Sequence, residues 1–348
     1  MELLARTFDV HDDDEVQQLY RERGWTDGLP VVAPTPARVE AMLNHSAFAP
    51  DQVIGIEPVK QRALTAEKVA VNAVLAGCLP PDFPVVAAAV EAMCKPEFLV
   101  HGATASTGGC AVLLVVSGPI RRQLGMSSAH SVLAGADRAS ICIGRAVRLV
   151  LRNLLEVRPG ELDRSTLGHP GKISWCVAED EEGAAPWLPL GAERGMPAEV
   201  SSVTAFAASG PRQIMNEWTT DPEEVATTIV AEIKATMLHY SIWSGNYAVV
   251  VPPQLRRVFH DAGWSKADLR AFVHEHAVVR RTDWEAVGKA AVVTDRNRHY
   301  TYSALPSPDH LLVIAAGGEA GGFAAVIPPW LGPKSAAATA AIGVCIDC

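Results

Sequence analysis

The feature that most constrains the fold is a loop of small residues that leads directly into an uninterrupted apolar run. Residues 101–110 read H-G-A-T-A-S-T-G-G-C, and residues 111–116 read A-V-L-L-V-V. A short run that is apolar at every position is typical of a strand buried on both faces. The run leaves through S-G-P-I-R-R, a turn followed by a helix start. This arrangement predicts an α/β protein.

Strand-like and helix-like segments alternate in two blocks, which predicts two α/β lobes with mixed or mostly parallel sheets. Residues 51–160 form the first expected lobe and residues 201–332 the second. Residues 1–50 predict an N-terminal helix and an extended segment. Residues 161–200 are rich in Gly, Pro and acidic residues and predict a long irregular crossing segment. Residues 333–348 form an apolar tail. Two lobes usually enclose a ligand cleft between them, so we expect a cleft here.

Helix starts are marked by capping residues. Asp137 can cap a helix over 138–155, and Asp221 with Pro222 opens another. Ser265 and Asp268 have the spacing of a capping box. The apolar runs at 247–253 and 310–318 predict two further strands.

Composition excludes several classes of partner. The chain has 348 residues and a formal net charge of −9, without a Lys/Arg cluster, which argues against nucleic acid and anionic membrane surfaces. No segment reaches the roughly 18 consecutive apolar residues of a membrane span, and the N-terminus lacks the pattern of a secretory signal. The seven cysteines are an odd number and lie mostly among apolar residues. We therefore expect reduced thiols and a cytoplasmic location. The expected partners are a small-molecule substrate and a second copy of the chain or a partner protein.

The loop at 101–110 and the helix at 138–155 predict half of an anion pocket. Small residues let backbone N–H groups approach a ligand, and arginines can hold a carboxylate in bidentate fashion. The alternative is tight packing beside a solvated arginine face, and Arg148 and Arg152 are assigned to that face. The expected substrate-binding residues are His101, Thr107, Gly108, Gly109, His130, Arg138 and Arg145.

The missing proton-transfer groups are expected from the loop at 169–181. His169, Lys172 and Glu179 are the candidate acid and base residues. Cys110 and Cys176 are the candidate nucleophiles or thiolate ligands, and a divalent metal is the candidate cofactor. An exposed polar loop and buried structural cysteines are the alternatives. The prediction is that residues 101–152 and 169–181, distant in sequence, meet in one cleft.

Two further patterns carry weaker expectations. Cys345 and Cys348 form a Cys-x-x-Cys pair that can bind a soft metal or undergo redox exchange, although one pair cannot complete a tetrahedral zinc site. The alternative is an apolar tail that docks on a neighbour or frays. Lys68 and Asn72 are four residues apart on one helix face, so both can point into a cleft or simply into solvent.

Several strings together resemble a known group of proteins. They are D-G-L-P-V-V-A-P-T-P-A-R-V-E-A-M-L, N-A-V-L-A-G-C-L-P-P-D-F-P-V-V, S-G-P-I-R-R, I-G-R-A-V-R-L-V-L-R-N, L-G-H-P-G-K-I-S-W-C-V-A-E-D-E-E and A-G-W-S-K-A-D-L. Over residues 28–332 the chain resembles the large domain associated with the UGSC-type (seleno)protein family of poorly characterised bacterial proteins. The Sec/Cys-Gly-Ser-Cys motif of the associated small module is absent from this sequence. The resemblance therefore implies a link to sulfur or redox chemistry without assigning residues to it.

Together these patterns predict an enzyme that acts on a small polar molecule carrying a carboxylate. The expected reaction is a lyase or hydrolase step at a C–S or C–N bond in a cleft between the two lobes. Thiol-redox or soft-metal handling through Cys345 and Cys348 is one alternative. A non-catalytic ligand-binding subunit is the other.

Overall fold

Two four-stranded mixed sheets form the centre of the protein. The computed structural model describes residues 2–197, 199–240, 244–332 and 334–343. The first sheet has the order β12 (Ala338–Ala341), β5 (Ser202–Ala208), β3 (Ala111–Ser117) and β4 (Cys176–Ala178). β4 runs parallel to β3, whereas β5 is antiparallel to β3 and β12 is antiparallel to β5.

The second sheet repeats this pattern. Its order is β6 (Arg212–Met215), β11 (Phe323–Ile327), β7 (Tyr247–Val251) and β10 (Leu311–Ala315). β10 runs parallel to β7, β11 is antiparallel to β7, and β6 is antiparallel to β11. Each sheet therefore has two central strands, one parallel neighbour and one antiparallel edge strand.

Each antiparallel edge strand follows a strand of the other sheet in the chain. β6 follows β5 in the chain but pairs with β11 of the second sheet. β12 follows β11 but pairs with β5 of the first sheet. The second sheet is therefore built from one continuous segment, residues 212–327, whereas the first sheet takes three strands from residues 111–208 and its edge strand β12 from residues 338–341.

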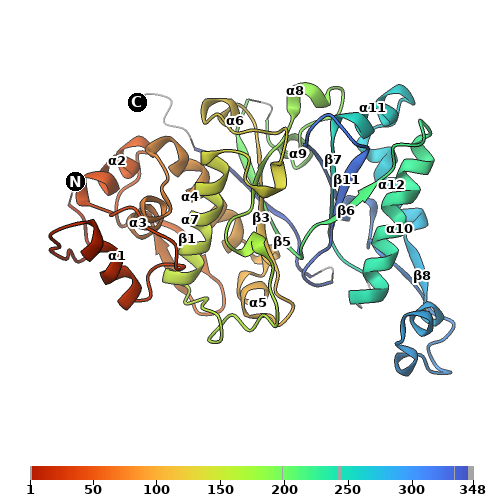
Figure 1. Ribbon diagram of the computed structural model, residues 1–348, viewed down its shortest axis with the longest axis horizontal. Helices are drawn as coiled ribbons and strands as arrows, with labels where there is room; N and C mark the ends of the chain where they lie inside the picture. The colour runs from red at the N-terminus through yellow and green to blue at the C-terminus, as the bar shows by residue number, and fades with distance from the viewer. Residues whose placement is uncertain (1, 198, 241–243, 333, 344–348) are drawn as a thin grey trace.

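The two sheets pack face to face. Side chains alternate along β3, so Leu113 and Val115 point to the second sheet while Leu114 and Val116 point to a helical layer. The core between the sheets also contains Phe206, Val250 and Ile314. Figure 1 shows the resulting order of helices, first sheet, second sheet and helices along the long axis.

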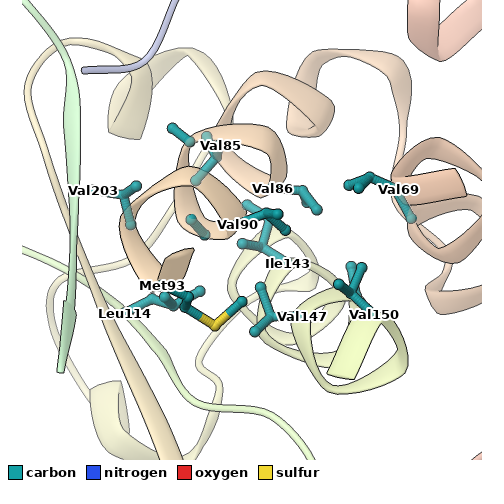
Figure 2. Packing of buried hydrophobic residues seen from close by; sticks show 14 of the residues in the cluster. Val69, Val85, Val86, Val90, Met93, Leu114, Ile143, Val147, Val150 and Val203 are labelled. Atoms are coloured by element: carbon teal, nitrogen blue, oxygen red, sulfur yellow. The ribbon is translucent and has the colours of Figure 1, made fainter. Parts of the chain in front are cut away.

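Helices α4 (Phe83–Cys94) and α7 (Arg138–Leu154) cover the first sheet, and α3 (Ala66–Ala76) packs against them. Eight of the twelve residues of α4 are Ala, Val or Met, and the helix is buried on nearly every side. The Asp137 side chain accepts a hydrogen bond from the Ser140 N–H and so caps α7. Figure 2 shows apolar side chains of α4 and α7 packed against Leu114 and Val203 of the sheet.

Helices α10 (Pro222–Tyr240), α11 (Pro253–Asp261) and α12 (Lys266–His276) cover the second sheet. The predicted capping box of α12 is present, because Ser265 Oγ accepts from Asp268 N–H and the Asp268 carboxylate accepts from Ser265 N–H. The remaining elements are α1 (Asp13–Glu22), α2 (Pro36–His45), α5 (Val100–Ala105), α6 (Ile120–Gln123), α8 (Glu181–Ala184), α9 (Leu190–Glu193), the hairpin β1 (Val53–Glu57) and β2 (Arg62–Thr65), and the hairpin β8 (Val278–Arg280) and β9 (Thr301–Ser303).

The α/β class with mixed sheets is confirmed, and several predicted boundaries need correction. Residues 161–200 are not an irregular crossing segment throughout, because they contain β4. Residues 202–208 belong to the first sheet rather than to a second lobe, and the tail contributes β12 to that sheet. Among the described residues, no helix is long and apolar enough to cross a membrane.

The predicted cleft between two lobes needs the same correction. Where the sheets face each other, the space is filled by a buried apolar core. The two cavities described below both lie on the other side of the first sheet, among or beyond its covering helices.

Candidate functional site

A small cavity lies between β3 and α7, where α5 and residues 106–110 meet residues 168–175. The predicted loop at 101–110 is thus helical over its first half. It has a volume of about 30 Å³ and is lined by Ala103, Thr104, Cys110, Ala111, Val112, Gly144, Val147, Arg148, Leu151, Val157, Gly171, Lys172 and Ala207. We call it the Arg148 pocket. Cys110 and Lys172 line it together, so the predicted meeting of the two segments occurs at this cavity.

Glycines allow these segments to approach closely. A Cβ on Gly144 of α7 would lie 2.6 Å from the backbone nitrogen of Trp175, and one on Gly109 would lie 2.7 Å from the backbone nitrogen of Gly168. Gly109 also has a φ of +71°, a conformation that other residues adopt only at a cost. The small-residue pattern in the sequence therefore reflects the packing of two loops against α7.

Arg148 is the most unusual group in the pocket. Its side chain is only 13% exposed, and its nearest acidic partner is Asp163, with 3.8 Å between Arg148 Nη2 and Asp163 Oδ2. Among the described residues, no acceptor lies within hydrogen-bond distance of this guanidinium. Burial lowers the pKa of Arg148, partly offset by Asp163. A guanidinium has five N–H donors, so this one requires acceptors that the described chain does not supply.

Lys172 lies beside Arg148 and is fully engaged. Its Nζ is 2.8 Å from Asp163 Oδ2 and 2.6 Å from Ser165 Oγ. The Ser165 hydroxyl in turn donates to Asp163 Oδ1 at 2.5 Å. Burial raises the pKa of Asp163, but hydrogen bonds from Lys172 and Ser165 outweigh this and hold the pKa below its ordinary value. The site therefore has two cations and one carboxylate, which leaves an excess positive charge.

The cysteines that were predicted as nucleophiles are buried thiols. Burial raises the pKa of Cys110 to about 12, although Lys172 opposes this, and its Sγ donates to the Ala103 carbonyl at 3.0 Å. Burial likewise raises the pKa of Cys176. At neutral pH both remain thiols, and the thiol is a poor nucleophile and metal ligand. Burial therefore argues against a thiolate at either position.

The three residues predicted to transfer protons do not share a site. His169 stacks edge-on against Trp175, and its ring nitrogens face the Ala208 carbonyl and the Gly171 N–H. Burial lowers the pKa of His169, which keeps the ring neutral at pH 7. His169 and Lys172 precede β4 in the chain, whereas Glu179 follows it. The strand therefore separates Glu179 from the other two by roughly 10 Å of chain.

Glu179 belongs to a buried ion cluster instead. Its carboxylate accepts from Lys266 Nζ at 3.0 Å, from Ser117 Oγ at 3.1 Å and from the Leu190 N–H at 2.6 Å. Glu179 and Lys266 are 1% and 3% exposed, and Lys266 also contacts Glu193. Every oxygen of Glu179 has a partner, which is the pattern of a structural group rather than of a free base.

The two arginines predicted to bind an anion are each held by a carboxylate of the chain itself. Arg138 makes two hydrogen bonds to Asp82, at 2.6 and 3.0 Å. Arg145 makes two to Asp27, at 2.9 and 2.8 Å, and a third to the Pro30 carbonyl. We expected these arginines to hold a ligand carboxylate in bidentate fashion, but each instead binds an aspartate of the chain.

The other predicted binding residues do not line the pocket. The carbonyl of Thr107 accepts from the Thr166 N–H, and that of Gly108 accepts from the Tyr240 hydroxyl. His101 Nδ1 is 3.9 Å from Glu57 Oε1. His130 is exposed and lies against Gly318, in the glycine-rich turn between β10 and β11. Thr107, Gly108 and Gly109 thus position the loop, while His101 and His130 belong to other surfaces.

No group of three or more His, Cys, Asp or Glu side chains suited to a metal occurs in the described part of the chain. Cys345 and Cys348 lie outside the described residues. The metal expectation therefore stays a prediction. Sequence reasoning missed Arg148, Asp163 and Ser165, because only the folded chain brings Asp163 next to α7. The available signal was Asp163-Arg-Ser165 a few residues before Lys172.

Known proteins add no family to this picture. The chain matches no protein-family model, and it matches no curated protein. The resemblance to the large domain associated with the UGSC-type family stays a prediction.

Proposed function

We propose that this protein binds a small carboxylate-bearing molecule, with the carboxylate hydrogen-bonded by Arg148 in the Arg148 pocket, beside the charge of Lys172. The observation that carries the proposal is the guanidinium of Arg148. It is largely buried, faces a cavity, and has no hydrogen-bond acceptor among the described residues. A ligand carboxylate would supply the missing acceptors and neutralise the excess positive charge.

The size of the cavity limits what can enter. A volume of about 30 Å³ exceeds the roughly 10–15 Å³ that one water needs and suits two oxygen atoms better than a whole substrate. We therefore place the carboxylate inside and the remainder of the ligand towards the mouth. The apolar walls contributed by Val112, Val147 and Leu151 strengthen the ionic contact by excluding water.

Binding is better supported than turnover. For the expected lyase or hydrolase step, the Ser165 hydroxyl would be the nucleophile and Asp163 the proton acceptor, because these two groups are hydrogen-bonded. Yet Lys172 holds the pKa of Asp163 low, which makes it a weak base. The ligand-binding role therefore comes first, and a reaction at a C–S or C–N bond is the second candidate.

Titration calorimetry with sodium acetate tests the proposal, with acetamide as the neutral probe of the same shape. We expect saturable acetate binding that Arg148→Met weakens by about tenfold or more, since a hydrogen-bonded charge pair contributes roughly 1.5–3 kcal/mol. Arg152→Met is the matched control, because Arg152 lies one turn further along α7 and contacts the Gly24 carbonyl instead.

Equal acetate affinities in the wild-type protein and Arg148→Met would overturn the proposal, as would equal binding of acetamide and acetate. The same titration with Ser165→Ala separates binding from turnover. This variant should retain acetate affinity, and loss of any C–S or C–N cleavage with binding intact would support the catalytic candidate.

A further inference from the structure

A second and much larger cavity lies at the N-terminal end of the molecule. It has a volume of about 550 Å³ and is enclosed by residues 3–10, α1, α2, α3 and the end of α7. Figure 1 shows these elements at the left of the molecule, far from the second sheet. We call this cavity the strap pocket, because residues 3–10 cross it as a strap. Its size falls within the roughly 300–1,000 Å³ typical of sites for small organic molecules.

The strap is fixed by one buried carboxylate. The Leu4 N–H donates to both oxygens of Glu67, at 3.1 and 2.9 Å, and the Ala5 N–H donates to Oε1 at 2.8 Å. Glu67 is 2% exposed. Its charge is therefore committed to holding the strap and is not available to a ligand.

The walls of the strap pocket are mainly apolar and aromatic. The largest contributors come from the strap, from α1 and the turn after it, and from α2 and α3. They are Leu3, Phe8, Val10, Val16, Leu19, Tyr20, Trp25, Val39, Val71 and Leu75. Such walls favour an apolar body, since each buried CH₂ group of a ligand contributes about 0.8 kcal/mol.

Polar groups converge at one side of the strap pocket. Asn72 is 2% exposed, donates to the Lys68 carbonyl and accepts from Asn153 Nδ2 at 2.7 Å. The Oδ1 atom of Asn153 is buried and has no hydrogen-bond partner in the described part of the chain. A buried acceptor of this kind costs stability unless a donor such as water satisfies it, so a carboxylate head group belongs at the lysine rather than at this oxygen.

The charges at the strap pocket favour an anion. Arg6, Lys68 and Glu40 line it, and none of the three has an ion-pair partner among the described residues. Because Glu67 is occupied by the strap, two free cations face one free carboxylate. Lys68 stands one turn from Asn72 on the same helix, so a charged head group near Lys68 would also lie near the polar side of the strap pocket.

We propose that the strap pocket binds an amphipathic monocarboxylate, with its apolar body among the aromatic and aliphatic walls and its carboxylate at Lys68. The site is separate from the Arg148 pocket, and the two proposals share no residue. The sequence already placed Lys68 and Asn72 on one helix face, and the structure shows what that face borders.

The test uses three eight-carbon probes: sodium octanoate, 1-octanol and octylamine. Binding is followed by displacement of 8-anilinonaphthalene-1-sulfonate fluorescence at constant ionic strength. We expect octanoate to bind more tightly than octanol, and octylamine to bind most weakly. Lys68→Gln should weaken octanoate about tenfold and octanol less than twofold. Lys60→Gln, an exposed lysine without a side-chain partner among the described residues, is the matched control.

Filling the strap pocket gives an independent arm. Val10→Trp adds bulk from the strap at a position that is 38% exposed, so folding is not at stake, and it should abolish binding of all three probes. Unchanged octanoate binding in Val10→Trp would overturn the strap pocket as the site. Tightest binding by octylamine would overturn the charge preference and point to Glu40. Arg148→Met should leave octanoate binding unchanged, so this test and the acetate test fail separately.

Discussion

The helical layers over the two sheets both bury a cation, and they treat it in opposite ways. Lys266, over the second sheet, is 3% exposed and lies between the carboxylates of Glu179 and Glu193. Arg148, over the first sheet, is 13% exposed and has only a 3.8 Å contact with a carboxylate that Lys172 already occupies. A buried charge that is fully matched by the chain holds the fold together. One that is left unmatched at a cavity indicates a ligand.

The largest expected loss of stability is at Lys266, the buried cation whose charge the chain matches. Lys266→Met should destabilise the protein by about 3–5 kcal/mol, because it leaves the buried charge of Glu179 without its counter-ion. Urea denaturation monitored by circular dichroism measures the change.

The double variant Lys266→Met/Glu179→Gln provides the control for that prediction. Removing both charges should restore much of the lost stability, since the penalty arises from the orphaned carboxylate. A loss below about 1 kcal/mol in the single variant would contradict the interpretation of this cluster as structural.

An intermediate loss of stability is expected at Arg145, whose charge is paired with that of Asp27. Asp27→Asn should cost about 1–3 kcal/mol by removing the two charge-assisted hydrogen bonds to Arg145. Burial raises the pKa of Asp27, but the hydrogen bond and charge of Arg145 more than offset this, and the folded-state pKa is below its ordinary value.

The sign of the pH dependence follows from that direction. The stability contributed by Asp27 is fully present above its unfolded pKa of about 4 and is lost as the pH falls through the folded value. Denaturation at pH 7 and at pH 3 should therefore show the wild-type advantage over Asp27→Asn shrinking in acid. An advantage that grows in acid would refute the assignment.

The smallest effect on stability is expected at Arg148, the buried cation that the chain leaves without a close carboxylate of its own. Arg148→Met should change the free energy of unfolding by less than about 1 kcal/mol, because Asp163 keeps Lys172 and Ser165 and a desolvated charge is removed. The same denaturation series measures it beside Lys266→Met. A loss as large as that of Lys266→Met would place Arg148 among the structural cations and erase the contrast.

Local signals in the sequence predicted most elements of the fold. The run at 111–116 is the central strand β3, and the capping residues Asp137 and Ser265 begin α7 and α12 as expected. β4 was missed because it has three residues inside a segment rich in Gly and acids. β12 was missed because three of its four residues are Ala, which is depleted in strands. Sheet membership was missed because it depends on pairing between distant segments.

The candidate site was predicted in part, for the same reason. The small-residue loop and the 169–172 loop do meet, so Cys110 and Lys172 share a pocket. The choice among arginines could not be made from the sequence, because Arg138, Arg145 and Arg148 share one helix. What separates them is the position of Asp82, Asp27 and Asp163, which only the tertiary structure fixes.

The pairing of β12 with β5 has a consequence for how the chain folds during synthesis. Thr204 of β5 and Thr339 of β12 are hydrogen-bonded although they are 135 residues apart. During synthesis on the ribosome, β5 therefore emerges long before the strand that covers its open edge. Until then the first sheet presents unpaired backbone groups that invite pairing with other chains. Completion of the first sheet should be the last step of folding and the one most dependent on chaperones.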